Sequence, residues 1–244
     1  MFSNYSKYYD LLYQDKNYKK ETDYLINIIK KYKISSGNLL EFGSGTGKHG
    51  YLLAEKGYNV NGIELSAEMV SKSKGHPKFT CKQGDIAKVN VKQSFDVVFS
   101  LFHVISYQTN NNQINAVFNN ASKHLKKEGL FIFDFWYSPA VYNLKPSVRV
   151  KRFQNKQFKI IRVAEPENLS DKNLVNINYT FFINDLVKDT QISFKETHTM
   201  RHFSLPEIDL LAEMNGLKCL ESHEFLSKKK PSEETWGVCV VLKK

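Results

Sequence analysis

The residues best suited to chemistry lie in one short stretch, LLEFGSGTGKHG, at positions 39–50. An apolar burst is followed by three glycines, Gly43, Gly45 and Gly47, and then by a helix-like segment. Glycines between a strand and a helix let a ligand approach the backbone closely, and the helix N-terminus exposes free N–H groups to it. The stretch therefore predicts a ligand-binding loop at the end of a strand.

Two phosphate-binding loops resemble this stretch only in part. A P-loop needs GxxxxGK followed by a hydroxyl residue, but Phe42 replaces its first glycine and His49 replaces the hydroxyl. A dinucleotide loop, GxGxxG, is matched literally by Gly45, Gly47 and Gly50. The P-loop is therefore excluded at two positions, whereas the dinucleotide loop stays open.

Two acids refine the choice of ligand. Glu64 ends the next apolar burst, which suits a ribose-binding acid in either kind of nucleotide site. Glu41 ends the first burst, two residues before the first glycine. A carboxylate there would repel a pyrophosphate but attract an ammonium and a sulfonium, so it favours a cationic ligand.

In these residues the sequence resembles the class I S-adenosylmethionine-dependent methyltransferases, whose first motif is E/DxGxGxG. Further motifs follow in the family's order: GIELS at 62–66, QGDI at 83–86 and FDVVFSLFHVISY at 95–107. The resemblance implies that Glu64 holds the ribose hydroxyls, that Asp85 contacts the adenine amine and that Ile86 stacks on the ring. It implies S-adenosylmethionine as cofactor, no metal, and a donor site formed by Glu41, Gly43, Ser44, Gly45, Gly47, Glu64, Leu65, Met69, Asp85, Ile86 and Leu101.

A closer resemblance is to bacterial N,N-dimethyltransferases of nucleotide-linked amino sugars. It rests on YYDLLYQDKNY at 8–18, LFHVISY at 101–107 and FWYSP at 135–139. It implies that Tyr107 faces the acceptor amine, with His103 as the second catalytic residue. The expected acceptor contacts from these motifs are Tyr9, Tyr13, Tyr18, Trp136 and Tyr137.

The sequence departs from that group at two places, and the departures leave alternatives open. His103 and Val104 replace paired serines, and residues 231–236 replace a glycine-rich arginine segment. The leading expectation is methyl transfer to the amine of a nucleotide-linked amino sugar or a similar phosphorylated metabolite. The alternatives are an O-methyltransferase of a glycan precursor with His103 as base, and a non-catalytic donor-binding regulatory subunit. Because residues 100–103 contain no proline, methyltransferases of nucleobases or amides, which carry a double proline there, are disfavoured.

Alternating strand-like and helix-like segments predict the elements that position these residues. Strands are expected at 38–42, 58–65, 79–83, 95–101, 130–136, 217–225 and 236–243, and helices at 18–32, 48–56, 66–74 and 112–127. A last helix should begin after Ser204 as N-cap and stop at Gly216. The expected fold is α/β: a Rossmann-like, seven-stranded, mostly parallel sheet.

Residues 148–202 lack helical periodicity and predict a small antiparallel sheet inserted before the last helix, with turns at 165–168 and 184–185. The expected division is a core of 1–147 and 203–244, with an N-terminal helix on the acceptor side, and an acceptor-binding insertion of 148–202. Strand alternation places Glu196, His198 and His202 on one face and Arg201 on the other. His198 and Arg201 are expected to contact the acceptor. The candidate cations for a diphosphate are Arg149, Arg152 and Lys228–Lys230.

Composition limits the partners and the compartment. Thirty-five Lys and Arg residues against 25 Asp and Glu give a formal charge of +10, which favours anionic partners. The lysines are dispersed, so a small anionic acceptor is favoured over nucleic acid. The three cysteines form no CxxC pair, and neither a signal peptide nor an apolar run of membrane-spanning length is visible. We therefore expect a cytoplasmic protein that does not bind membranes; the sequence does not indicate its oligomeric state.

Overall fold

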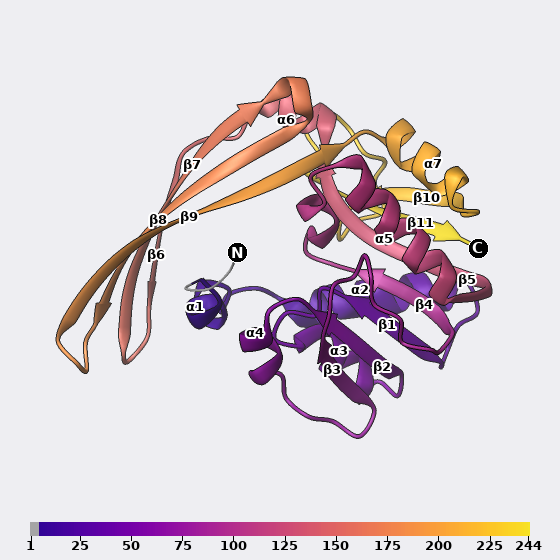
Figure 1. Cartoon of the computed structure of the whole chain (residues 1–244), viewed down its shortest axis with the longest axis horizontal. Helices are drawn as coiled ribbons and strands as arrows, with labels where there is room; N and C mark the ends of the chain where they lie inside the picture. The colour runs from indigo at the N-terminus through magenta and orange to yellow at the C-terminus, as the bar shows by residue number, and fades with distance from the viewer. Residues whose placement is uncertain (1–4) are drawn as a thin grey trace.

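A seven-stranded sheet forms the centre of the protein in the computed structural model, which describes residues 5–244 (Figure 1). Residues 1–4, counted above with the core, lie outside the described residues. The strand order is β3–β2–β1–β4–β5–β11–β10. The strands are β1 (Asn38–Phe42), β2 (Asn59–Glu64), β3 (Phe79–Gln83), β4 (Phe95–Ser100), β5 (Leu125–Tyr137), β10 (Lys218–Glu224) and β11 (Gly237–Lys243). β11 pairs antiparallel with β5 and β10, and the other neighbouring strands in this order pair in parallel. The predicted Rossmann-like, mostly parallel sheet is confirmed.

Helices cover both faces of this sheet because each carries an apolar stripe. The helices are α1 (Tyr5–Leu12), α2 (Tyr18–Lys31), α3 (Lys48–Glu55), α4 (Ala67–Ser71), α5 (Asn111–His124), α6 (Ser138–Leu144) and α7 (Leu205–Met214). On one face α5 and α7 bury Phe118 and Ile208, and on the other α2 and α3 bury Ile29 and Leu53. The sheet is therefore buried on both sides, as expected of parallel strands joined by crossover helices.

The inserted strands form a long antiparallel arch rather than the small sheet that was predicted (Figure 1). The arch consists of β6 (Arg149–Gln154), β7 (Phe158–Leu169), β8 (Leu174–Asp185) and β9 (Thr190–Phe203). Its last strand joins the main sheet, because His202 and Phe203 pair in parallel with Trp136 and Tyr137 at the end of β5. The arch thus extends the main sheet beyond the end of β5.

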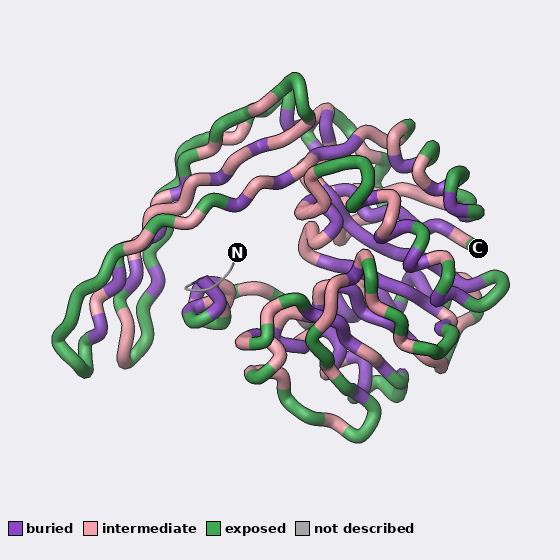
Figure 2. The backbone as a smooth tube through the Cα atoms, in the orientation of Figure 1, coloured by how far each residue is buried: buried purple, intermediate pink, exposed green. Residues whose placement is uncertain are grey.

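The concave side of the arch packs on α1. Tyr5, Tyr8 and Leu12 from α1 share an apolar cluster with Phe153 and Phe181 from the arch. Figure 2 shows the corresponding buried segments along α1 and along the inner side of the arch. The N-terminal helix therefore lies between the arch and α4, because the Ser6 hydroxyl of α1 donates a hydrogen bond to Glu68 of α4.

Several predicted boundaries were wrong. The turn expected at 184–185 is strand, because β8 continues to Asp185. The helix expected at 112–127 ends at His124, because Leu125 already pairs with Phe95 as the start of β5. The helix expected at 66–74 is only Ala67–Ser71. The turn expected at 165–168 is strand: β7 continues through Pro166, where it pairs only with β8, and an edge strand tolerates proline. The Ser204 cap and the stop at Gly216, with φ +67°, are confirmed.

Candidate active site

The glycine loop follows β1 in a backbone conformation that favours glycine. Gly43, Gly45 and Gly47 have φ values of +74°, +57° and +77°. Gly43 N–H donates to the carbonyl of Ile63 on β2 at 2.8 Å, which ties the loop to the neighbouring strand. A Cβ at Gly43 would lie 2.5 Å from Val104, whereas a Cβ at Gly45 would meet nothing within 4 Å. Val104 therefore fills the space beside Gly43, whereas the space above Gly45 is open to a ligand.

Two buried carboxylates flank this loop. Glu64, at the end of β2, accepts hydrogen bonds from the N–H groups of Gly45 at 2.9 Å and Ser66 at 2.8 Å. Glu41, in β1, is only 1% exposed and accepts a hydrogen bond from the Ser44 hydroxyl at 2.6 Å. Burial raises the pKa of Glu41 to about 8. The structure thus brings together the predicted residues Glu41, Ser44, Gly45 and Glu64.

The residues expected around the adenine occupy different environments. The Leu65 side chain, next to Glu64, is 60% exposed, whereas Met69 is buried in the cluster that contains the α1 tyrosines. Asp85 accepts a hydrogen bond from Ala87 N–H at 2.9 Å. Ile86 and Leu101 are buried in the two main apolar clusters. Of these five side chains, Leu65 and Asp85 are the ones with substantial exposed surface.

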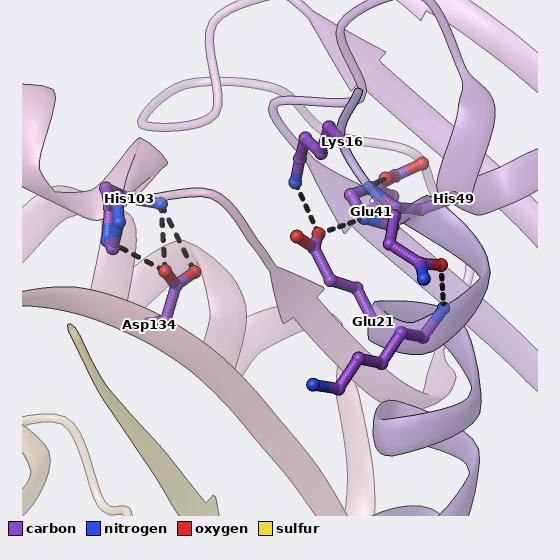
Figure 3. A network of polar contacts seen from close by, with 8 residues as sticks. Lys16, Glu21, Glu41, His49, His103 and Asp134 are labelled. Atoms are coloured by element: carbon purple, nitrogen blue, oxygen red, sulfur yellow. Dashed lines mark hydrogen bonds and ion pairs between the residues drawn. The ribbon is translucent and has the colours of Figure 1, made fainter. Parts of the chain in front are cut away.

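A buried row of titratable side chains lies behind Glu41 (Figure 3). Lys16 forms an ion pair with Glu21, and Glu21 Oε2 lies 2.7 Å from His49 Nε2. The other ring nitrogen of His49, Nδ1, lies 3.7 Å from Glu41 Oε1. A row of four polar side chains therefore connects the partly buried Lys16 to the acid beside the glycine loop.

Burial and pairing set the charges in this row. Burial alone would raise the pKa of Glu21, but its contacts with His49 and Lys16 lower it below the ordinary value. Burial lowers the pKa of His49, and it lowers the pKa of Lys16 as well. At neutral pH the His49 ring is therefore neutral, and it separates the Lys16–Glu21 ion pair from Glu41.

The predicted catalytic residue His103 is held by an acid on β5. His103 has φ +60°, and its backbone N–H donates to both carboxylate oxygens of Asp134 at 3.2 Å. Its ring Nδ1 lies 2.8 Å from Asp134 Oδ2, at ion-pair distance, while Asp134 is completely buried (Figure 3). The carboxylate thus holds the backbone of His103 by hydrogen bonds and lies beside its ring, and the side chain remains partly exposed.

The other predicted catalytic residue, Tyr107, contacts the arch. Its hydroxyl lies 3.0 Å from Nδ1 of His198 on β9, and His198 Nε2 lies 3.3 Å from Glu196. The rings of Tyr5 and Tyr179 meet the His198 ring edge-on at centroid distances of 4.9 and 5.0 Å. Burial raises the pKa of Tyr107 and lowers that of His198. A protonated phenol and a neutral imidazole therefore face each other at neutral pH.

The remaining predicted acceptor residues divide into two sets. Tyr9 of α1 packs on Tyr13, the residue that follows this helix, at a ring-centroid distance of 4.8 Å, and Trp136 packs against the same apolar cluster as Tyr107. The other set points elsewhere: Tyr18 packs on His49, Tyr137 on the main apolar cluster, and Arg201 bonds to Asn111 and Glu207. The structure therefore does not bring Tyr18, Tyr137 and Arg201 together with Tyr107.

Several polar residues of this region were not singled out from the sequence. Asp134 stands in the apolar run LFIFDFW, where a lone acid indicates a buried partner. His49 was noticed only as a mismatch to the P-loop, and nothing in the sequence indicated its contact with Glu21. Asp134 could have been found from its strand; the Lys16–Glu21–His49 row could not, because its members come from separate elements.

The fold and the loop define a class of protein. Residues 39–129 match the family model described as "Methyltransferase domain". The structure of the amino pentose methyltransferase CalS10 from Micromonospora echinaspora, solved with S-adenosylmethionine bound, superimposes with a TM-score of 0.78 over 100% of this chain and 98% of that chain, at 18% identity. Residues 39–129 thus resemble a methyltransferase domain, and the chain has the fold of a solved S-adenosylmethionine-bound methyltransferase.

Curated relatives agree with this class. The chain is 25% identical over 137 residues to the dTDP-3-amino-3,4,6-trideoxy-alpha-D-glucopyranose N,N-dimethyltransferase of Streptomyces venezuelae, a match that covers 55% of this chain and 58% of that protein. It is 31% identical over 141 residues to an uncharacterized methyltransferase of Bacillus cereus (strain 03BB102), covering 54% of this chain and 64% of that protein. The chain thus spans little more than half the length of these relatives. No helix within residues 5–244 is long and apolar enough to cross a membrane.

Proposed function

We propose that the protein transfers a methyl group from S-adenosylmethionine to the amine of a small anionic acceptor, with a nucleotide-linked amino sugar as the preferred class. The observation that carries the proposal is the pair of buried acids, Glu41 and Glu64, around a glycine loop that is open above Gly45. The dimethyltransferase from Streptomyces venezuelae, whose name specifies an amino sugar acceptor, supports the acceptor class.

The residues present suit this donor. When bound, the donor would supply a methyl group attached to a sulfonium. The acceptor would attack the methyl carbon in line, and the sulfur would leave as a neutral thioether. Glu41 is protonated in the free site at neutral pH, because its pKa is about 8, and a cationic ligand bound beside it would favour loss of that proton. Glu64 is placed to accept hydrogen bonds from ribose hydroxyls. The open space at Gly45 lets the ligand approach the backbone of the loop closely. In this proposal, Leu65 offers apolar surface beside the ribose.

On the acceptor side, Tyr107 and His198 orient the amine. The amine must be neutral to attack, and the Tyr107 hydroxyl oxygen can accept a hydrogen bond from it. His198 Nδ1, 3.0 Å from that hydroxyl, is a neutral base to which a proton can pass after methylation. Positioning of this kind can contribute on the order of 7–11 kcal/mol to lowering a barrier, so little further acid–base chemistry is required.

A second candidate function, O-methylation, is favoured by the His103–Asp134 pair. A hydroxyl acceptor must lose its proton as it attacks, so it needs a base in contact with it. A histidine whose Nδ1 lies 2.8 Å from a fully buried carboxylate has the arrangement of such a base. The same residue would serve an amine acceptor only as part of the wall of the site.

Donor binding is the first test. Calorimetric titration with S-adenosylhomocysteine should show a single site in the wild type. Glu64→Ala should weaken binding at least tenfold, whereas Glu55→Ala, which removes an exposed acid at the end of α3, should leave it unchanged. The absence of binding, together with binding of a nicotinamide dinucleotide, would overturn the proposal.

Acceptor class is the second test. The enzyme and a deuteromethyl donor are incubated with matched pairs of thymidine diphosphate sugars that carry either an amine or a hydroxyl at the same carbon, and the products are weighed by mass spectrometry. Transfer to the amine only supports N-methylation. Transfer to the hydroxyl that Asp134→Asn abolishes supports O-methylation, and donor binding without any transfer supports a regulatory subunit.

A further inference from the structure

Arg162 is a buried cation on the concave side of the arch. In β7 the residues Ile160, Arg162 and Ala164 alternate onto the buried face, and Arg162 is only 7% exposed. Its guanidinium lies over the rings of Phe153 at 5.4 Å and Tyr179 at 5.1 Å. The two aromatic rings contact the cation through their faces and leave the N–H groups at its rim available.

Two of the three nitrogens of this guanidinium have no hydrogen-bond partner within the described chain. Among residues 5–244, Arg162 Nε and Nη1 have no hydrogen-bond partner, and no carboxylate lies within ion-pair distance of the group. The acid on the same face, Glu196, is in register with Tyr179 and pairs with His198 instead. A buried charge without an anion is strongly unfavourable, so a role in binding an anion explains why an arginine stands there.

We propose that Arg162 binds the anionic group of the acceptor, a phosphate or a carboxylate, through its planar pair of N–H donors. The proposal rests on the proposed function, and it specifies where the negative charge of the acceptor lies. Guanidinium is the side chain best matched to two oxygens of either group, because its donors form a fixed fork.

Its place in the arch connects Arg162 to the acceptor chemistry. Arg162 contacts Tyr179, Tyr179 contacts His198, and His198 contacts the Tyr107 hydroxyl, so one continuous row of side chains leads from the cation to the proposed methylation site. The cations considered from the sequence are placed differently: Arg149, Arg152 and Lys228–Lys230 are all exposed. Arg162 is therefore the cation that an acceptor bound beside Tyr107 would meet.

The test uses probes that cannot be methylated. The protein, saturated with S-adenosylhomocysteine, is titrated calorimetrically with thymidine diphosphate, glucose 1-phosphate, glucuronate and, as the neutral probe, methyl glucoside. Arg162→Met removes the charge, and Arg162→Lys keeps the charge but removes the fork. Lys159→Met, which removes an exposed cation from the opposite face of the same strand, is the matched control.

We expect at least one anionic probe to bind the wild type and the control equally, at least tenfold more weakly to Arg162→Met, and with intermediate affinity to Arg162→Lys. Binding to the phosphates or to glucuronate identifies the anion. Equal binding of the anionic probes to Arg162→Met, or binding of none of them to the wild type, overturns the proposal. A fall of more than 5 °C in the melting temperature of Arg162→Met relative to Lys159→Met also overturns it, because the stacking of Arg162 on the aromatic rings would then be structural. Failure of S-adenosylhomocysteine to bind would refute the proposed function instead, and the same titrations without it would still test Arg162.

Discussion

Glu41, the buried acid beside the glycine loop, makes the protein less stable as the pH rises, whereas most acids in folded proteins have the opposite effect. Burial raises the pKa of Glu41 to about 8, whereas an unfolded glutamate titrates near pH 4.3. Between these values the unfolded chain has lost the proton and the folded protein has kept it. Folding therefore takes up a proton, and stability falls by about 1.4 kcal/mol for each pH unit of increase in that interval.

Glu41→Gln removes this titration while keeping a side chain of the same shape that can still bond to Ser44. Urea unfolding of both proteins is measured at pH 5.5 and 7.5. Over these two units the glutamine variant should gain about 2 to 3 kcal/mol relative to the wild type. Because other groups titrate equally in both proteins, the difference isolates Glu41.

The control is Glu55→Gln, whose side chain is exposed at the end of α3. Its stability should stay parallel to that of the wild type over the same interval. If Glu41→Gln and the wild type also run parallel, Glu41 is ionised in the folded protein, and the reasoning from its burial is refuted.

The other predictions concern the loop, the acceptor residue and a helix cap. Gly43→Ala should destabilise the protein by about 1–3 kcal/mol in urea unfolding, because its Cβ would meet Val104 at 2.5 Å and its φ is +74°. Gly45→Ala should cost about 1–2 kcal/mol from its φ alone but weaken S-adenosylhomocysteine binding more than Gly43→Ala does; equal affinities would contradict the open side of the loop. Tyr107→Phe should lower kcat for an amine acceptor about tenfold or more while donor affinity stays unchanged, and an unaffected kcat would exclude a role in orienting the amine. Ser204→Ala should destabilise by about 1 kcal/mol, because Ser204 and Glu207 form a capping box, and an unchanged urea midpoint would contradict that contribution.

Sequence patterns predicted the core of this fold because they report local geometry. Apolar bursts ending in Glu41 and Glu64 located two strand ends, and the order of helices and strands defined the sheet. Parallel strand ends meet at one edge, so the contacts of Glu64 with the glycine loop followed from the order of the elements alone. The acceptor side was predicted less completely, since its contacts join α1, the arch and the end of β5.

Two omissions show where pattern reading failed. In FKIIRVAE, alternation places Arg162 on the apolar face with Ile160, a conflict that indicates a special role but was not recognised. The row from Lys16 through Glu21 to His49 depends on how α2 packs against α3, which no local pattern records. Long-range polar contacts of this kind require the three-dimensional structure.

The chain leaves the main sheet and returns to it at the same point. Tyr137, the last residue of β5, is in register with Phe203, the last residue of β9, so departure and return are adjacent although the whole arch lies between them. Hairpins of the arch can therefore lengthen, shorten or change their inward side chains without moving either anchor. Under the proposed function, such a construction lets the acceptor contacts of the arch change while the glycine loop and its acids, on strands on the far side of β4, keep their positions.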